Sequence, residues 1–218
     1  MSLSSTSAGW LKVHKKGGVL LRKLFALFLA LCLIPVVALA QTADPEGAAE
    51  SEIITYDFGG FTMDIPADIQ GQIVEPVSGQ IFFQLYPDYN ETESFHKNIT
   101  CVWMDAYEDL TQVDPAAFAQ VGATSALTSL RLQGIAIENE QILGAVLDEH
   151  EGKPAMSYVI SMDADYAALG LDFKTTLYMA VFVISDENLG SYTFTISVTN
   201  PEDIDPIVEM MNTIKWAA

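Results

Sequence analysis

The stretch TTLYMAVFVIS, residues 175–185, decides the fold class because both of its alternating side-chain sets are apolar. Successive side chains of an extended strand point to opposite faces of a sheet. The two sets are Leu177, Met179, Val181 and Val183 on one face, and Tyr178, Ala180, Phe182 and Ile184 on the other. A strand that is apolar on both faces needs cover on both, so we predict a central strand with packed layers above and below it.

The segments around this strand have strand patterns as well. SYTFTISVT (191–199) alternates apolar with hydroxyl-bearing residues, which predicts a strand with one apolar face. ENEQILGAVLDEHEG (138–152) and KPAMSYVISMDAD (153–165) precede it along the chain. Residues 151–154 and 186–190 are rich in turn-forming residues. Strands joined by such short turns predict an antiparallel sheet.

The first part of the chain after residue 52 has the pattern of a hairpin. IITYDF (53–58) and GFTMDIP (60–66) flank a Gly-Gly pair, and in the second segment Phe61, Met63 and Ile65 share one side. GQIFFQLYP (79–87) and NITCVWMDAY (98–107) predict two further strands.

Two Asp-Pro pairs mark predicted helix starts. Asp114 and Pro115 supply an N-cap and a first helical residue, and the only helix breaker before Leu130 is Gly122. The second pair, at 205–206, precedes apolar residues at helical spacing, namely Ile207, Met210, Met211 and Ile214. Antiparallel strands with one helix in the middle and one at the end predict an α+β fold, an antiparallel β-sheet flanked by helices.

The chain resembles the PsbP-like family in four features. These are Tyr-x-Phe-x-x-Phe-Thr-x-x-x-Pro at 56–66, a hairpin around EGKPAMSYVIS, a strand pair ending in GSYTFTISVT, and the closing helix IVEMMNTIKW. The family includes the photosystem subunit PsbP, the Ran-binding protein Mog and envelope proteins such as DcrB. The Trp common after the early Pro in this family is absent here, where ADIQGQ follows Pro66. The resemblance implies an αβα sandwich over residues 53–218 and a docking or accessory role without catalysis.

Residues 1–40 have the layout of a secretory signal. RKLFALFLALCLIPVVALA (22–40) has a basic start, an apolar run, and small residues at Ala38 and Ala40, which predicts cleavage after Ala40. A retained membrane anchor is the alternative, although 17 apolar residues are short for a span. Translation could also begin at Leu21 if its codon is TTG. We expect residues 41–52 to be a flexible acidic linker, and the protein to be secreted or in a bacterial cell envelope.

Charge limits the partners that this chain can bind. Loss of residues 1–40 removes 5 of the 10 basic groups and none of the 29 acidic groups, which leaves a formal net charge of −24. Such a surface repels nucleic acid and anionic membranes. We therefore expect no nucleic-acid binding, no membrane insertion after signal cleavage, and an unknown protein or envelope component as partner, with cations as the alternative. Strong acidity could also serve solubility alone.

The sequence supplies no catalytic signature. The two remaining histidines, His96 and His150, lie in polar stretches that predict solvated loops. Cys101 alternates with Ile99 and Trp103 on a predicted strand, which indicates a buried, inert thiol. We expect no catalytic residues, no cofactor site and no enzymatic activity, with a hydrolase as the weaker alternative.

Two surfaces are candidates for binding. Asp163, Asp165 and Asp172 are close in sequence and calcium prefers carboxylates, but the spacing fails the EF-hand pattern, so we assign no metal ligands. Residues 115–130 contain no charged residue. Phe118, Val121, Leu127 and Leu130 are expected to pack inward, with Gln120, Thr124, Ser125, Thr128 and Ser129 outside. This neutral helix face could dock a partner, although the ordinary explanation is a helix buried deeply against the sheet.

Overall fold

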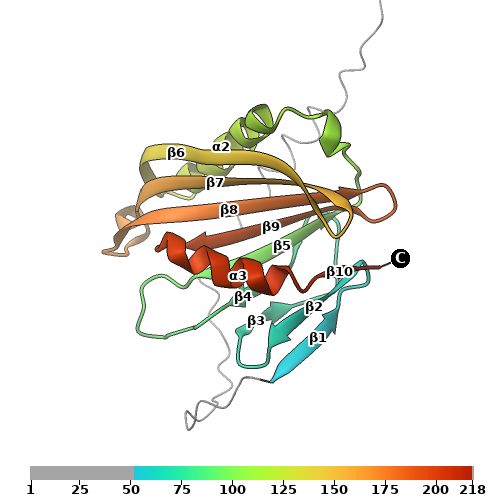
Figure 1. Ribbon diagram of the computed structural model, residues 1–218. Helices are drawn as coiled ribbons and strands as arrows, with labels where there is room; N and C mark the ends of the chain where they lie inside the picture. The colour runs from blue at the N-terminus through green and yellow to red at the C-terminus, as the bar shows by residue number, and fades with distance from the viewer. Residues whose placement is uncertain (1–51, 218) are drawn as a thin grey trace, which may run out of the picture.

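Residues 52–217, which the computed structural model describes, form a single α+β domain with two antiparallel sheets (Figure 1). The large sheet has the strand order β3-β4-β5-β9-β8-β7-β6, and the small sheet has the order β1-β2-β10. The strands are β1 (Ile53–Asp57), β2 (Phe61–Pro66), β3 (Gln70–Ile73), β4 (Ile81–Tyr86), β5 (Asn98–Met104), β6 (Ala136–His150), β7 (Lys153–Asp165), β8 (Lys174–Asp186), β9 (Gly190–Val198) and β10 (Lys215–Trp216). The signal, start-site and linker predictions for residues 1–51 lie outside the described residues.

The doubly apolar strand is β8, and its prediction is confirmed. β8 lies inside the large sheet between β9 and β7. Its odd-numbered residues from Leu177 to Val183 are buried against the layer that contains α2 (Pro115–Leu132), while Ala180 and Ile184 are buried in the opposite layer. The sheet therefore separates two cores, one on each face.

The helix α2 covers one face of the large sheet and lies behind β6 and β7 in Figure 1. Its predicted cap is confirmed, because an Asp114 side-chain oxygen accepts a hydrogen bond from the Ala117 backbone N–H at 2.8 Å. The inward side of this helix is buried as expected at Phe118, Leu127 and Leu130. Val121 is only half-buried, and Ser129, expected outside, is buried.

The other face of the large sheet is covered in part by the small sheet and by α3 (Ile204–Met211). The β1–β2 hairpin pairs Asp57 with Thr62 next to its turn, and the predicted inward residues Phe61, Met63 and Ile65 are all buried. Phe61 has its ring centroid 4.9 Å from that of Phe58. The hairpin thus brings an aromatic cluster onto the large sheet.

The start of the last helix was predicted two residues late, at Pro206 with Asp205 as its cap. α3 begins at Ile204, directly after the 3-10 turn η3 (Pro201–Asp203), and the Asn200 side chain caps that turn by accepting from the Glu202 N–H at 3.2 Å. Pro206 is tolerated because it lies in the first helical turn, where backbone N–H groups have no helical acceptor. Met210 is half-buried rather than buried.

The end of the chain also differs from the prediction. Ile214 is fully buried, but it lies beyond the helix, in the connection to β10. The strands β10 and β3 were not predicted, because two and four residues are too short for a periodic signal. β9 alternates as predicted, yet Thr195 and Ser197 on its hydroxyl-bearing face are buried, since β9 is the middle strand of seven. No helix among residues 52–217 is both long and apolar enough to span a membrane.

Candidate functional site

The two histidines are half-buried rather than solvated, which corrects the prediction from their polar sequence context. The His96 ring lies 4.4 Å from the Tyr89 ring, and the His150 ring lies 6.2 Å from the Trp216 ring, measured between centroids. The Nδ1 atom of each is buried without a hydrogen-bond partner in residues 52–217. Neither imidazole is hydrogen-bonded to a hydroxyl or thiol in this part of the chain, so neither is placed to activate a nucleophile.

Cys101 is fully buried in the core on the α3 side of the large sheet, as predicted. Burial raises the pKa of its thiol well above the usual value, because the low-dielectric interior disfavours the thiolate. The thiol is therefore a packing group.

The three aspartates considered for calcium do not form a ligand set. Asp163 accepts hydrogen bonds from Asn139 at 2.7 Å and Thr176 at 2.9 Å, and these bonds lower its pKa. Asp165 forms an ion pair with Lys174 at 2.6 Å, which lowers its pKa in turn. A cavity of about 390 Å³ lies beside these two carboxylates. Residues 52–217 contain no cluster of three or more side chains able to hold a metal ion.

The outer side of α2 is a neutral stripe, as predicted from its lack of charge. Gln120, Thr124 and Thr128 are exposed on it. The hydroxyls of Thr124 and Thr128 donate to the backbone carbonyls of Gln120 and Thr124, each at 2.7 Å. Because each hydroxyl is already bonded within the helix, the stripe has few groups to offer a polar partner.

A second uncharged surface lies on the opposite side of the large sheet, where α3 does not reach. α3 lies over β9 and β5 and leaves β6, β7 and part of β8 uncovered toward the viewer in Figure 1, while Ala180 and Ile184 of β8 are buried in the core on this side. The strand registers put one set of residues on this surface, which we call the open face: Val146, Ser157, Val159, Ser161, Tyr178 and Phe182. The side chains of β7 and β8 in this set are half-buried, and Val146 is 55% exposed.

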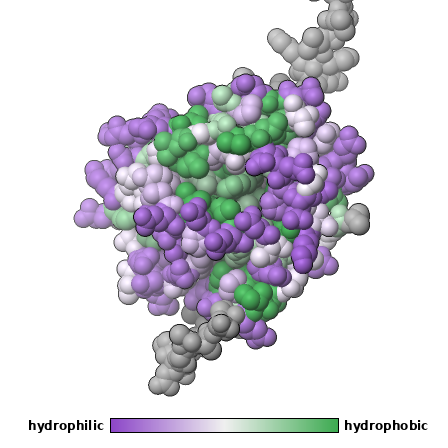
Figure 2. Space-filling model, in the orientation of Figure 1, coloured by the Kyte–Doolittle hydropathy of each residue, from purple (hydrophilic) through white to green (hydrophobic). Residues whose placement is uncertain are grey.

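Carboxylates border the open face at both ends. Asp148 on β6 and Asp163 on β7 lie on the same side of the sheet as the open face. Asp148 is opposite Ala155 and Asp163 is opposite Thr176, and in each strand these positions are an even number of residues from those of the open face. Figure 2 shows apolar residues gathered in the upper part of this view, with hydrophilic residues around them. An apolar centre with a polar rim is the usual anatomy of a protein-docking surface.

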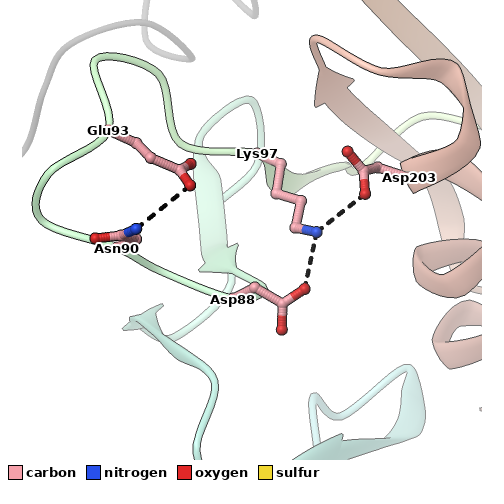
Figure 3. A network of polar contacts seen from close by, with 5 residues as sticks. All are labelled: Asp88, Asn90, Glu93, Lys97 and Asp203. Atoms are coloured by element: carbon pink, nitrogen blue, oxygen red, sulfur yellow. Dashed lines mark hydrogen bonds and ion pairs between the residues drawn. The ribbon is translucent and has the colours of Figure 1, made fainter.

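The basic residues are almost all committed to internal ion pairs. Residues 52–217 contain five basic and 26 acidic groups. Lys97 bridges Asp88 at 2.8 Å and Asp203 at 3.1 Å, and so ties the β4–β5 loop to η3 (Figure 3). The other pairs are Arg131 with Glu140, Lys153 with Asp186 and Lys174 with Asp165. Five basic groups cannot neutralise 26 carboxylates, so the surface stays strongly negative.

Sequence reasoning found the α2 stripe but missed the open face. The α2 stripe shows in the sequence as a run without charge. The open face depends on β6 being an edge strand and on the shortness of α3, and neither shows in periodicity. One signal was present in the sequence: in the ILGAVL run at 142–147, neither alternating set of side chains is polar. A strand with apolar residues on both faces that ends a sheet must expose some of them, as Leu143 and Val146 are exposed here.

The sequence matches no protein-family model and no curated protein at a significant level. The structure is similar to the solution structure of cyanobacterial PsbP from Synechocystis sp. PCC 6803, with 12% sequence identity, a TM-score of 0.50, and coverage of 80% of this chain and 98% of that one. The Ran-binding protein Mog1p from Saccharomyces cerevisiae is 13% identical, with a TM-score of 0.47 and coverage of 76% of this chain and 96% of its own. At such identities the likeness concerns the fold alone. The likeness to cyanobacterial PsbP shows that the chain has a PsbP-like α+β fold, as its sequence features suggested.

Proposed function

We propose that this protein is an exported, non-enzymatic binding or assembly module, and that its partner is a protein with a basic surface. The observation that carries the proposal is the charge distribution. Four of the five basic side chains in residues 52–217 are held in internal ion pairs, among 26 carboxylates. A partner must therefore supply the cations, and long-range attraction would steer its approach.

The uncharged open face supports the same proposal. It places apolar side chains on the surface of a molecule that is otherwise dominated by carboxylates, and such a patch lowers its free energy by being covered. Basic groups on the partner would lie against the acidic rim while apolar groups cover the centre. The acidic rim would then set the association rate, and the apolar centre would set the dissociation rate.

The test is capture of a partner from an extract of the source organism's envelope. The immobilised protein is compared at 0.1 M and 1 M NaCl, where the Debye length falls from about 10 Å to about 3 Å. We expect a basic protein to be retained at low salt and lost at high salt. Val146→Asp should weaken its retention by burying an unpaired charge at the interface, while Thr124→Asp should leave it unchanged.

The outcomes separate the alternatives. Loss of the partner with Thr124→Asp alone would move the docking surface to the α2 stripe. Capture of no protein under any condition would contradict the proposed function, and a melting temperature raised by calcium would then favour the cation-binding alternative.

A further inference from the structure

We propose that the partner binds by adding an extended basic segment to the outer edge of β6, next to the open face. This inference rests on the proposed function and specifies its geometry. β6 is the last strand of the seven-stranded sheet and pairs only with β7 in the described part of the chain. Its outer backbone N–H and C=O groups are thus available to a further strand.

The part of β6 that can accept a strand is defined by its register. Irregularities between Glu138 and Gln141, and between Ile142 and Ala145, interrupt the pairing with β7 in the first half of the strand. From Ala145 to His150 the pairing is continuous. A bulged segment twists its edge away from an incoming strand, so the six regular residues 145–150 are the accessible template.

The side chains at this edge protect it only against some strands. Carboxylates such as Asp148 and Glu149 discourage pairing with another acidic strand, as charged residues on an edge do, but they do not repel a basic one. Here Leu143 and Val146 are 54% and 55% exposed, and Val146 projects from the open face beside Ser157. An added strand would continue the large sheet and place one of its own side chains next to Val146, where burial of both is favourable.

Charge selects the kind of strand. Asp148 and Glu149 lie within the regular segment, and neither forms an ion pair in the described part of the chain. If a second copy of this chain paired antiparallel over residues 145–150, each Asp148 would lie diagonally across from Glu149 of the other copy on the same face of the sheet, and this like-charge contact, made twice, disfavours the pairing. The edge thus disfavours self-association and fits a segment that combines apolar residues with lysine or arginine.

The test uses a defined probe rather than the unidentified partner. The probe is the synthetic peptide Lys-Lys-Thr-Val-Thr-Val-Thr-Lys-Lys, and its comparison is the same peptide N-methylated at both valines and at the central threonine. N-methylation keeps the charge and apolar groups but removes backbone donors and blocks close strand approach. Affinity is measured by calorimetry at 0.1 M NaCl, and amide hydrogen exchange is followed across the protein.

We expect the unmodified peptide to slow exchange in residues 145–150 and to leave α2 unchanged, and the N-methylated peptide to bind at least tenfold more weakly. Asp148→Lys combined with Glu149→Lys should weaken binding by at least tenfold. The matched control is Glu75→Lys combined with Glu91→Lys, which changes the net charge equally at exposed positions near the β3–β4 side of the sheet. The melting temperature of each variant verifies that it is folded.

Each result has a consequence. Equal binding of the two peptides, protection elsewhere than residues 145–150, or absence of peptide binding would each overturn the edge inference. Equal weakening by the two double variants would also overturn it, because attraction would then depend on net charge alone. None of these results removes the proposed function, which is tested separately by capture of a partner from the envelope extract and by the salt dependence of its binding.

Discussion

Replacement of Phe61 by alanine tests whether the N-terminal hairpin is an integral part of the core. Phe61 is 1% exposed, and its ring centroid lies 5.3 Å from those of both Tyr192 and Trp216. The side chain thus joins β2 of the small sheet to β9 of the large sheet and to the C-terminal strand. Truncation of a buried phenylalanine typically lowers the free energy of unfolding by about 3–5 kcal/mol.

We expect Phe61→Ala to cost about 4 kcal/mol, in the middle of this range, because several aromatic contacts are lost together with the buried area. A single domain is typically stable by only about 5–15 kcal/mol, so the variant should unfold at a much lower urea concentration. The assay is equilibrium urea unfolding followed by circular dichroism. Ile54→Ala on the neighbouring strand is the control, since Ile54 is 39% exposed and should lose about 1 kcal/mol or less. A loss below about 1.5 kcal/mol for Phe61→Ala, or equal losses for both variants, would refute the reasoning.

Three further predictions follow from local geometry. A hydrogen bond from Lys153 holds the pKa of Asp186 below its usual value, so this carboxylate stabilises the fold above about pH 4 and its contribution fades as pH falls through the lowered pKa. The melting-temperature gap between wild type and Asp186→Asn should therefore close on acidification from pH 5, and a constant gap would contradict it. Gly190→Ala should cost more in urea unfolding than Gly170→Ala, because both have φ near +80° but a β-carbon at 190 would collide with a β5 carbonyl oxygen; equal costs would contradict this. Cys101 should resist alkylation in the native protein and react once urea unfolds it, as judged by peptide mapping, and rapid native labelling would contradict its burial.

Periodicity in the sequence was enough to predict the layers of the fold. The two apolar faces of β8 required two cores, and the single apolar face of β2 required the hairpin to lie with Phe61, Met63 and Ile65 inward. Both follow because the side-chain direction of a strand alternates strictly. The cap at Asp114 was predictable for a local reason as well, since one side chain decides it.

What could not be predicted depends on contacts between distant residues. β10 exists because Lys215 pairs with Thr62, more than 150 positions away, and nothing in two residues signals such a pairing. His150 is half-buried because its ring lies against that of Trp216, and the polar DEHEG sequence around His150 gives no sign of this distant contact. The open face is missed for the same reason, because exposure of Val146 is set by which strand ends the sheet.

The salt dependence of the association rate between this protein and the partner captured from the envelope tests the central claim most directly. With five basic groups against 26 acidic ones in residues 52–217, attraction should dominate the encounter. Surface plasmon resonance from 0.05 M to 1 M NaCl should show an association rate that falls by about tenfold or more, with a much smaller change in the dissociation rate. An association rate that is unchanged across this range would contradict recognition of a basic partner by an acidic module.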